Sequence, residues 1–344
     1  MASHFHHLTV KEIKKETLNT VSIIFNIPET ITSEFKYEAG QYLTLKATIN
    51  GEDIRRSYSI SSYTSTDQEL QVSCKMIEGG RMSTFLFKEL GVDDTLEVMA
   101  PMGNFTLDAV NKPLVLFAAG SGITPIISIL KKALTEGNNT VNLYYGNRAE
   151  EEVIFKSELT ELREKYTDRL LVQHFLSSNG ERLDSNRTQS LVSGLGDAKS
   201  TSNYFVCGPE GMISAVKSGL ETSSINANQI NIEYFASPKA EKAISETVVS
   251  GKVGDIIAEI DGEVHNITME SGESILDAAN RIGIDPPFSC QSGVCTTCKC
   301  KVMSGTVEME NNFGLGEDEE EEGFVLACIS KPTSAGVKVS WDED

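Results

Sequence analysis

The sequence predicts a multidomain protein of mixed α/β and β class. An antiparallel β-barrel is expected over residues 1–109, a doubly wound parallel α/β domain over 110–236, a linker over 237–252 and a compact α+β domain over 253–344. Apolar residues alternate with polar ones in the first part and gather in unbroken runs in the second, and five of the seven cysteines fall in the third. With 344 residues, the chain is long enough for each domain to bury its own core.

Short alternating segments predict the strands of the barrel. TVSIIFNI, QYLTLKATI and ELQVSCKMI alternate apolar and polar residues with the period of two that a half-buried strand requires. Glycine, proline and asparagine separate these segments, as expected for turns between antiparallel strands.

From Pro113 onward, strands and helices are expected to alternate. PLVLFAAG is a continuous apolar run that ends in glycine, and ITPIISILKKAL follows it with the apolar spacing of a helix. The strand-like runs TVNLYYG, LLVQHFL and NYFVCG then alternate with helical segments such as FKSELTELREKY and EGMISAVKSGL. This rhythm indicates a parallel sheet with helices on both faces.

The polar segment SPKAEKAISETVVSGK predicts the linker that precedes the third domain. In that domain DIIAEIDGEVHNITME predicts a hairpin, and SILDAANRIG predicts a short helix opened by an S-x-x-D cap. From Val253 onward 19 Asp and Glu stand against 5 Lys and Arg, which disfavours nucleic acid and suits docking on a basic patch of another protein. The acidic run Glu317–Glu322 is expected to be a solvated loop, with a part in such a docking surface as the alternative.

The spacing of Cys290, Cys295, Cys298 and Cys328 is C-x₄-C-x₂-C…C, which is typical of a plant-type [2Fe–2S] cluster. A structural zinc site is an alternative, but zinc sites usually pair two short arms and only one arm is short here. Disulfides need an oxidising compartment, whereas the N-terminal MASHFHHLTV lacks a signal-peptide pattern and seven cysteines cannot all pair. Cys300 is a second candidate for the third ligand; the x₂ spacing favours Cys298.

Two motifs of the predicted barrel indicate a flavin. Arg56-Ser57-Tyr58-Ser59 at a strand end offers an arginine for a pyrophosphate, a ring for stacking and a hydroxyl for the reactive edge. The glycines of Glu78–Leu86 precede a predicted helix, whose N-terminus suits the flavin phosphates. Each motif alone also fits an ordinary strand or an ordinary helix start, and their combination favours the flavin.

Two loops of the predicted α/β domain indicate a nucleotide site. Gly120–Pro125, with the sequence GSGITP, follows a buried strand and opens a helix, so that a pyrophosphate can approach the glycines. Cys207-Gly208-Pro209 ends another strand of the same sheet. Doubly wound sheets bind ligands at the carboxyl ends of their strands, so both loops are expected to face one crevice. Taken alone, Cys207 also fits inert packing.

In their order and approximate spacing, these motifs resemble the ferredoxin–NADP reductase superfamily fused to a C-terminal plant-type ferredoxin domain. The resemblance covers essentially the whole chain. Within it, RRSYSI, KMIEGGRMS, LEVMAPMGNF, AAGSGITPI, LYYGNR and GVCTTCKCKV are most similar to the reductase subunits of phenylacetyl-CoA oxygenase (epoxidase) systems. The resemblance implies a β-grasp fold for the ferredoxin domain, FAD as the flavin and a place in phenylacetate catabolism.

The resemblance also implies a role for each matching residue. Tyr58 is expected to stack on the flavin ring and Ser59 to bond near its N5, with Cys207 and Glu233 as the other residues at the reacting centre. The residues expected to bind FAD are Arg56, Tyr58, Ser59, Gly80, Met82, Ser83 and Phe235. Those expected to bind the nicotinamide nucleotide are Gly120, Gly122, Thr124, Pro125, Asn147, Arg148, Cys207, Gly208 and Pro209. The expected iron ligands are Cys290, Cys295, Cys298 and Cys328.

The predicted function is a two-to-one electron converter that takes a hydride from NADPH and passes single electrons through FAD and a [2Fe–2S] cluster to terminal oxygenase subunits. Ser59 and Cys207 would orient the reactants, and no general acid or base is required. A cation at Asn147-Arg148 favours NADPH through its 2′-phosphate, with a solvated arginine and NADH as the alternative.

The expected acceptor is the phenylacetyl-CoA ring-epoxidising oxygenase, docked near the acidic ferredoxin domain. Alternatives are a reductase for a ring-hydroxylating dioxygenase, a P450 or a desaturase, a redox-sensing iron–sulfur flavoprotein, and a zinc-stabilised binding module. A cytoplasmic location without membrane or nucleic-acid partners is expected, because no apolar run approaches the ~18 residues that span a bilayer.

Overall fold

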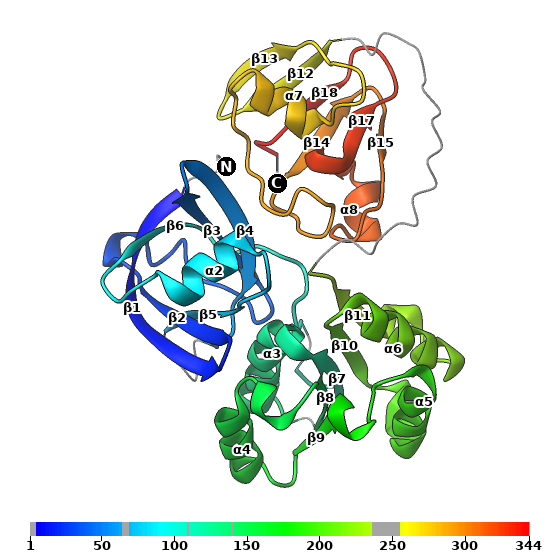
Figure 1. The fold of residues 1–344 in the computed structure, drawn as a ribbon. Helices are drawn as coiled ribbons and strands as arrows, with labels where there is room; N and C mark the ends of the chain where they lie inside the picture. Colours follow the sequence, from blue (N-terminus) through cyan, green and yellow to red (C-terminus); the bar gives the residue numbers. More distant parts are fainter. Residues whose placement is uncertain (1–4, 64–68, 109, 139, 236–254, 344) are drawn as a thin grey trace.

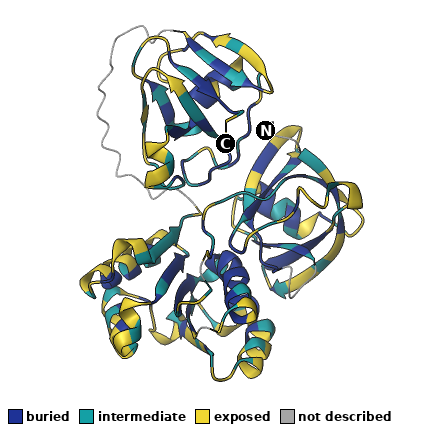
Figure 2. Cartoon of the chain, turned by 180° about the vertical axis from the view of Figure 1, so that it is seen from behind, coloured by how far each residue is buried: buried dark blue, intermediate teal, exposed yellow. Residues whose placement is uncertain are grey.

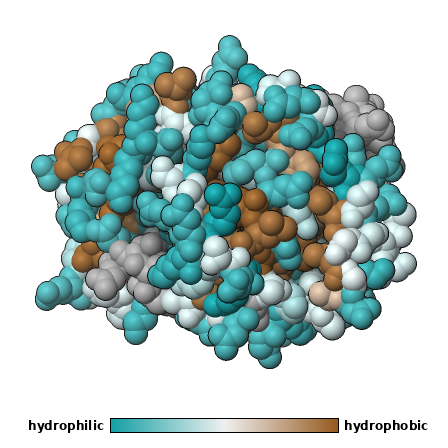
Figure 3. All heavy atoms as spheres, turned by 90° about the horizontal axis from the view of Figure 1, so that it is seen from below, coloured by the Kyte–Doolittle hydropathy of each residue, from teal (hydrophilic) through white to brown (hydrophobic). Residues whose placement is uncertain are grey.

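The computed structural model describes residues 5–63, 69–108, 110–138, 140–235 and 255–343, which form three domains (Figure 1). The predicted linker over 237–252 lies outside the described residues. Within the described ranges, no helix combines the length and the apolar character needed to cross a membrane. Seen from the side of the second domain, hydrophilic side chains cover most of the surface (Figure 3).

The first domain is an antiparallel barrel of six strands in the order β4-β3-β6-β1-β2-β5. Its elements are β1 (Phe5–Thr17), β2 (Thr20–Asn26), η1 (Glu29–Ile31), β3 (Tyr42–Ile49), β4 (Glu52–Ser59), β5 (Leu70–Lys75), α2 (Arg81–Lys88) and β6 (Thr95–Met99). A bridge between Ile60 and Val72 brings the two edges of the sheet together. Helix α2 packs on the barrel, and its Met82 and Leu86 side chains are buried in the apolar interior.

The second domain is a five-stranded parallel sheet in the order β11-β10-β7-β8-β9. Its strands are β7 (Leu114–Ala119), β8 (Val141–Asn147), β9 (Leu170–Leu176), β10 (Asn203–Cys207) and β11 (Ile230–Glu233). Its helices are α3 (Ile123–Glu136), α4 (Lys156–Lys165), α5 (Ser185–Gly194) and α6 (Glu210–Thr222), with the short turns η2 (Gly120–Gly122), η3 (Glu150–Glu152), η4 (Ser177–Asn179), η5 (Gly196–Ser200) and η6 (Ala227–Gln229).

The alternation of side chains along β7 explains why this sheet is covered on both faces. Leu116 packs with α3 and α4, whereas its neighbour Phe117 packs with α5 and α6. Helix α3 is buried along most of its length (Figure 2), because it also covers the barrel. There Ser128 Oγ donates to the carbonyl of Ser62 at 2.7 Å.

The third domain is a β-grasp unit whose main sheet has the order β13-β12-β18-β14-β16. Its elements are β12 (Ile256–Ile260), β13 (Glu263–Ile267), α7 (Ile275–Arg281), β14 (Lys299–Ser304), β15 (Val307–Met309), α8 (Glu317–Glu321), β16 (Phe324–Leu326), η7 (Ala327–Ile329), β17 (Ser330–Pro332) and β18 (Lys338–Ser340). The predicted cap is present: Ser274 Oγ accepts from the N–H of Asp277, and the Asp277 carboxylate accepts from the N–H of Ser274, both at 3.1 Å.

The predicted fold class is therefore confirmed, with one local correction. The acidic run Glu317–Glu322, expected to be a solvated loop, forms the short helix α8 and its C-cap. Glu319 in that helix accepts from the backbone N–H of Gly316 at 3.1 Å and pairs with Lys299 Nζ at 3.1 Å. These contacts offset the repulsion between neighbouring carboxylates and hold the turn.

Candidate functional site

Strand β4 carries the residues that the sequence predicted for a flavin. The Arg56 side chain is exposed and donates through Nη1 to the carbonyl of Arg55 at 2.6 Å. In the part of the chain that the structure describes, no carboxylate pairs with Arg56, so its charge is available to an anion. Tyr58 packs on the barrel interior beside Cys74, and burial raises the pKa of its phenol. Ser59 is buried at the end of the strand.

The turn before α2 has the local geometry of an anion site. Gly79 has φ = +72°, and a side chain at Gly80 would collide with Ser83 and Ile77, so both glycines are needed for the tight turn. Ser83 Oγ donates to the carbonyl of Gly80 at 3.2 Å and accepts from the N–H of Ile77 at 3.3 Å. No side chain caps the helix N-terminus, which leaves N–H groups free for phosphate oxygens. These residues fit FAD phosphates, and the Met82 side chain is buried in the barrel beneath the turn.

The two predicted nucleotide loops meet at the carboxyl edge of the parallel sheet. Strand order changes direction between β7 and β10, which is where doubly wound sheets bind their ligands. A side chain at Gly122 would collide with the carbonyl of Cys207, so the loops after β7 and β10 touch. Thr124 Oγ1 donates to the carbonyl of Ser121 at 3.0 Å and fixes the first turn of α3, in which Pro125 is also buried.

The second of these loops has an equally close approach. A side chain at Gly208 would lie 2.5 Å from Cε of Met212, and Pro209 is the N-cap of α6. The thiol of Cys207 donates a long hydrogen bond of 3.9 Å to Oε2 of Glu233, at the end of the neighbouring strand β11. Burial raises the pKa of Glu233 to about 8 and holds the pKa of Cys207 well above its usual value. Cys207 is therefore a neutral thiol at pH 7.

Four other predicted residues lie at or just after the carboxyl ends of strands of the same sheet. At the end of β8, the amide of Asn147 is buried with neither its oxygen nor its nitrogen bonded to a described group. The next side chain, Arg148, is 81% exposed and lies 3.7 Å from Glu152. Gly120 accepts from the hydroxyl of Tyr145 at 3.0 Å. Phe235 follows β11 and is 45% exposed.

The structure brings the four predicted iron ligands together in the third domain. Sγ of Cys295 lies 3.1 Å from Sγ of Cys290, and Cys328 contacts both Cys290 and Cys298. The N–H groups of Ser292 and Cys295 both point at Sγ of Cys290 at 3.4 Å. The contacts between the thiols lower the pKa of Cys290 and raise the pKa values of Cys295 and Cys328. Among the described residues, no group of three or more His, Cys, Asp or Glu is arranged to hold a single metal ion.

The conformation of the loop that carries three of these thiols requires a glycine at position 293, and the fifth cysteine of the domain, Cys300, lies outside this loop. Gly293 has φ = +75°, and a side chain there would lie 2.7 Å from the carbonyl of Asn311. Cys300 lies on β14 and is buried in the β-grasp core, and none of the hydrogen bonds among the thiols of the described residues involves it. The convergence of four sulfurs, with N–H groups directed at one of them, fits an iron–sulfur cluster.

The cluster loop is docked against the barrel through residues that the sequence did not single out. The hydroxyl of Tyr42 accepts from the N–H of Thr296 at 3.1 Å and lies 3.0 Å from Oγ1 of Thr297. Arg55 is buried, and its Nη2 donates to both carboxylate oxygens of Asp285 at 2.8 and 2.9 Å. These contacts join residues more than 200 positions apart, so no local pattern could reveal them.

A pocket of about 210 Å³ lies where the three domains meet. It is lined by Tyr42, Gly103, Asn104 and Phe105 of the barrel, Asn231, Ile232, Glu233 and Tyr234 at the end of the parallel sheet, and Val294, Cys295, Thr296, Phe313, Gly314, Leu315 and Gly316 of the β-grasp unit. The rings of Tyr234 and Phe313 are 5.1 Å apart across this junction. Of the predicted site residues, Glu233 of the nucleotide domain and Cys295 of the cluster loop line this pocket.

Three family models match the chain in the order of its domains. The oxidoreductase FAD-binding domain matches residues 7–107, the oxidoreductase NAD-binding domain matches 116–218, and the 2Fe-2S iron-sulfur cluster binding domain matches 258–333. The three cofactors expected from the motifs are therefore those of the matched domains.

Curated relatives match nearly the full length of the chain. One component of the 1,2-phenylacetyl-CoA epoxidase of Escherichia coli K12 is 37% identical, over 98% of each chain. The ferredoxin reductase component of 3-ketosteroid-9-alpha-monooxygenase from Rhodococcus rhodochrous is 36% identical, over 97% of this chain and 96% of its own.

Solved structures show the same fold. Phthalate dioxygenase reductase superposes with a TM-score of 0.61 at 23% identity, over 98% of each chain. An intact self-sufficient cytochrome P450 monooxygenase superposes with a TM-score of 0.75 at 20% identity; the match covers 97% of this chain but 41% of that longer one.

Proposed function

The chain belongs to the family of oxygenase reductases that join FAD- and NAD-binding domains to a [2Fe–2S] domain, and on that premise we propose that it supplies electrons from NADPH to a phenylacetyl-CoA ring-epoxidising oxygenase. Members of this family transfer electrons from NAD(P)H through FAD and the [2Fe–2S] cluster to an oxygenase. When bound, the nicotinamide and FAD supply hydride transfer, and the cluster supplies one-electron transfer.

The observation that carries the proposal is the docked junction. Tyr42 holds the loop of Cys295 against the barrel, and Glu233 from the nucleotide domain lines the same pocket. Residues from all three domains therefore line one pocket, which supports electron transfer between the domains in this arrangement. The similarity to the phenylacetyl-CoA epoxidase component supports the choice of acceptor.

The chain's own residues bind and orient in this scheme. Arg56 and the N-terminus of α2 would hold the FAD phosphates, and Tyr58 would stack on the ring. At the predicted nicotinamide site, the neutral thiol of Cys207 donates a hydrogen bond to Glu233, so each side chain holds the other in place. Cys207 therefore adds a polar group to the site without a charge. Ser59 would orient the flavin edge from the end of β4.

Arg148 supports NADPH as the donor. Its guanidinium is 81% exposed at the carboxyl end of β8, and its Nε lies 3.7 Å from Glu152, too far for a strong hydrogen bond. A guanidinium in this position is free to bind a 2′-phosphate in a bidentate manner.

The test is NADPH consumption coupled to loss of phenylacetyl-CoA, with and without the candidate oxygenase subunits. The proposal requires substrate loss only when this chain and those subunits are both present. NADPH-driven reduction of cytochrome c without loss of phenylacetyl-CoA, using oxygenase subunits that are active with another donor, would retain the reductase and reject this acceptor.

A ketosteroid oxygenase is the second candidate acceptor, because the 36% identity to the 3-ketosteroid-9-alpha-monooxygenase reductase nearly equals the 37% identity to the epoxidase component. Parallel assays with the two oxygenases decide between them. Turnover of the steroid alone would assign the chain to the second candidate.

A further inference from the structure

The four thiols differ in their exposure to solvent. A buried thiol and a half-buried one line two different pockets. Cys295 and Cys298 are buried, and Cys295 lines the pocket at the three-domain junction. Cys290 and Cys328 are half-buried, and Cys328 lines a different pocket. The two pockets share no residue.

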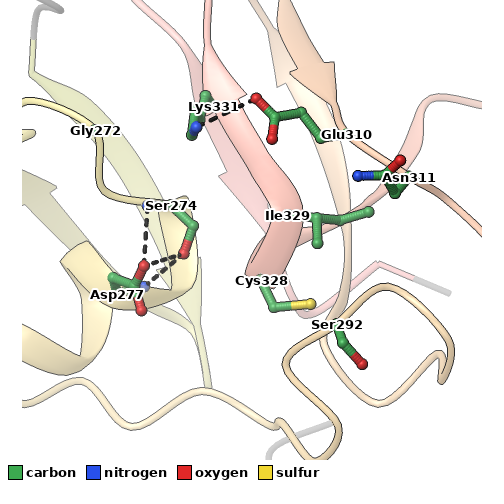
Figure 4. A pocket seen from close by; sticks show the side chains of 9 residues that line it. All are labelled: Gly272, Ser274, Asp277, Ser292, Glu310, Asn311, Cys328, Ile329 and Lys331. Atoms are coloured by element: carbon green, nitrogen blue, oxygen red, sulfur yellow. Dashed lines mark hydrogen bonds and ion pairs between the residues drawn. The ribbon is translucent and has the colours of Figure 1, made fainter. Parts of the chain in front are cut away.

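The second pocket, with a volume of about 310 Å³, is built entirely from the β-grasp domain. Figure 4 shows the Cys328 sulfur and Ser292 on one side of it, Ser274 and Asp277 at a second edge, and Glu310 paired with Lys331 at a third. Because neither of the other domains contributes a residue, the pocket stays accessible while the domain is docked on the barrel. Glu310 and Asp277 are exposed, so the rim presents carboxylates to solvent.

The acidic helix α8, by contrast, is directed toward the barrel. Glu319 accepts from Nδ2 of Asn104 of the barrel at 2.6 Å, and Glu320 accepts from Nδ2 of Asn312 at 2.6 Å. Gly316, the N-cap of α8, lines the three-domain pocket. Two of the carboxylates in the acidic run therefore serve contacts within the chain.

We propose that the oxygenase binds over the pocket of Cys328, Asp277 and Glu310 with a positively charged loop, and takes electrons there while the ferredoxin domain remains docked on the barrel. This inference rests on the proposed function and adds the surface used. Charge complementarity supports a basic occupant, since the charged residues that line the pocket are the carboxylates of Asp277 and Glu310 and one cation, Lys331. Each NAD(P)H oxidised to NAD(P)⁺ releases one proton and two electrons, which reduce the acceptor in two one-electron steps.

Three charge variants of the holoprotein test the surface. Glu310→Arg reverses a charge on the pocket rim, and Glu321→Arg makes the same change at the C-terminus of α8, where a cation suits the helix dipole. Lys331→Glu adds a carboxylate to the rim. Affinity for the oxygenase is measured by biolayer interferometry without NAD(P)H, and iron content and the rate of cluster reduction within each variant check that the site is intact.

The expected result is a loss of about tenfold in affinity for Glu310→Arg, tighter binding for Lys331→Glu and a change below about twofold for Glu321→Arg. Equal or greater loss with Glu321→Arg would overturn the proposal, and so would unchanged affinity in both rim variants. The Thr296 amide, which donates to Tyr42, reports on docking. Its hydrogen exchange must stay slow in the complex, and faster exchange would show that the domain leaves the barrel.

A cytochrome c assay separates the two proposals. If an oxygenase that is active with another donor accepts no electrons from the wild-type chain, the proposed function fails. The same three variants are then assayed with horse cytochrome c, a basic one-electron acceptor. A slower rate for Glu310→Arg but not for Glu321→Arg would support the exit surface, and equal rates would reject it.

Discussion

Arg55 is expected to fix the ferredoxin domain on the barrel, so Arg55→Ala should loosen that docking. The side chain is 7% exposed, bonds both carboxylate oxygens of Asp285 and stacks on Phe288, with 4.1 Å between the guanidinium carbon and the ring centroid. On the barrel side, the ring of Phe5 lies 5.2 Å away and supports the guanidinium.

The magnitude follows from these two contacts. Asp285 is 61% exposed, so its ion pair with Arg55 contributes at most about 1 kcal/mol. The stack on Phe288 adds about 1 kcal/mol. Alanine removes both, and a loss of about 2 kcal/mol shifts the ratio of docked to undocked molecules about 30-fold.

Two measurements test this. Stopped-flow absorbance at the cluster band, after mixing with NADPH, gives the rate of cluster reduction. Small-angle scattering gives the radius of gyration. Arg55→Ala should slow cluster reduction and expand the particle, without changing flavin reduction. Arg55→Lys keeps the charge but loses the planar stack and the paired hydrogen bonds, so it should lie between wild type and alanine.

Lys11→Ala is the control, because Lys11 lies on β1 of the barrel and its ion pair with Glu69 stays within that domain, away from the residues assigned to FAD. It should match wild type in both measurements. The reasoning is refuted if Arg55→Ala also matches wild type in both the rate of cluster reduction and the radius of gyration.

Three further variants test other parts of the site. Cys298→Ser should lose iron and the cluster absorption while NADPH still reduces the flavin; a folded variant that also loses flavin reduction would contradict independent binding sites. Arg148→Ala should raise KM for NADPH about tenfold and leave KM for NADH unchanged, as expected for one lost charge-assisted contact; equal effects on both would reject the 2′-phosphate role. Burial raises the pKa of Glu233 to about 8 from 4.5, so its stabilising contribution is complete below pH 4.5 and is lost as pH rises through about 8. Glu233→Gln should therefore flatten Tm between pH 5 and 9, and a Tm that falls as steeply as in wild type would exclude Glu233 as the cause.

Local patterns were sufficient to predict the domain types. The unbroken run PLVLFAAG forms β7 at the centre of the parallel sheet, because a strand covered on both faces has no polar side. The cap at Ser274 and Asp277 was predictable from four residues, since both partners lie within one helical turn. Motifs whose partners are local in sequence are therefore interpretable without the fold.

The acidic helix shows where local patterns fail. Six consecutive carboxylates at Glu317–Glu322 suggest repulsion and a loop. Their partners Lys299 and Asn104 lie on β14 and in the barrel, far from the run in sequence, and no composition argument includes them. Helix α8 thus depends on tertiary contacts that become visible only once the domains are assembled.

Strand β4 makes the same point for the site. From the sequence, its segment RRSYS is interpreted only as a flavin motif. Successive side chains of a strand point to opposite faces, however, so the segment presents two different surfaces. Arg56 and Tyr58 therefore share one face, and Arg55 and Ser57 share the other, where Arg55 binds Asp285 and Ser57 Oγ lies 2.8 Å from Oγ of Ser289, next to Cys290. The predicted flavin residue Ser59 shares the face of Arg55 and Ser57, so this strand separates Arg56 and Tyr58, but not Ser59, from the ferredoxin contacts. The roles of Arg55 and Ser57 depend on contacts with a domain more than 200 residues away, so they could not be interpreted from the sequence of this motif.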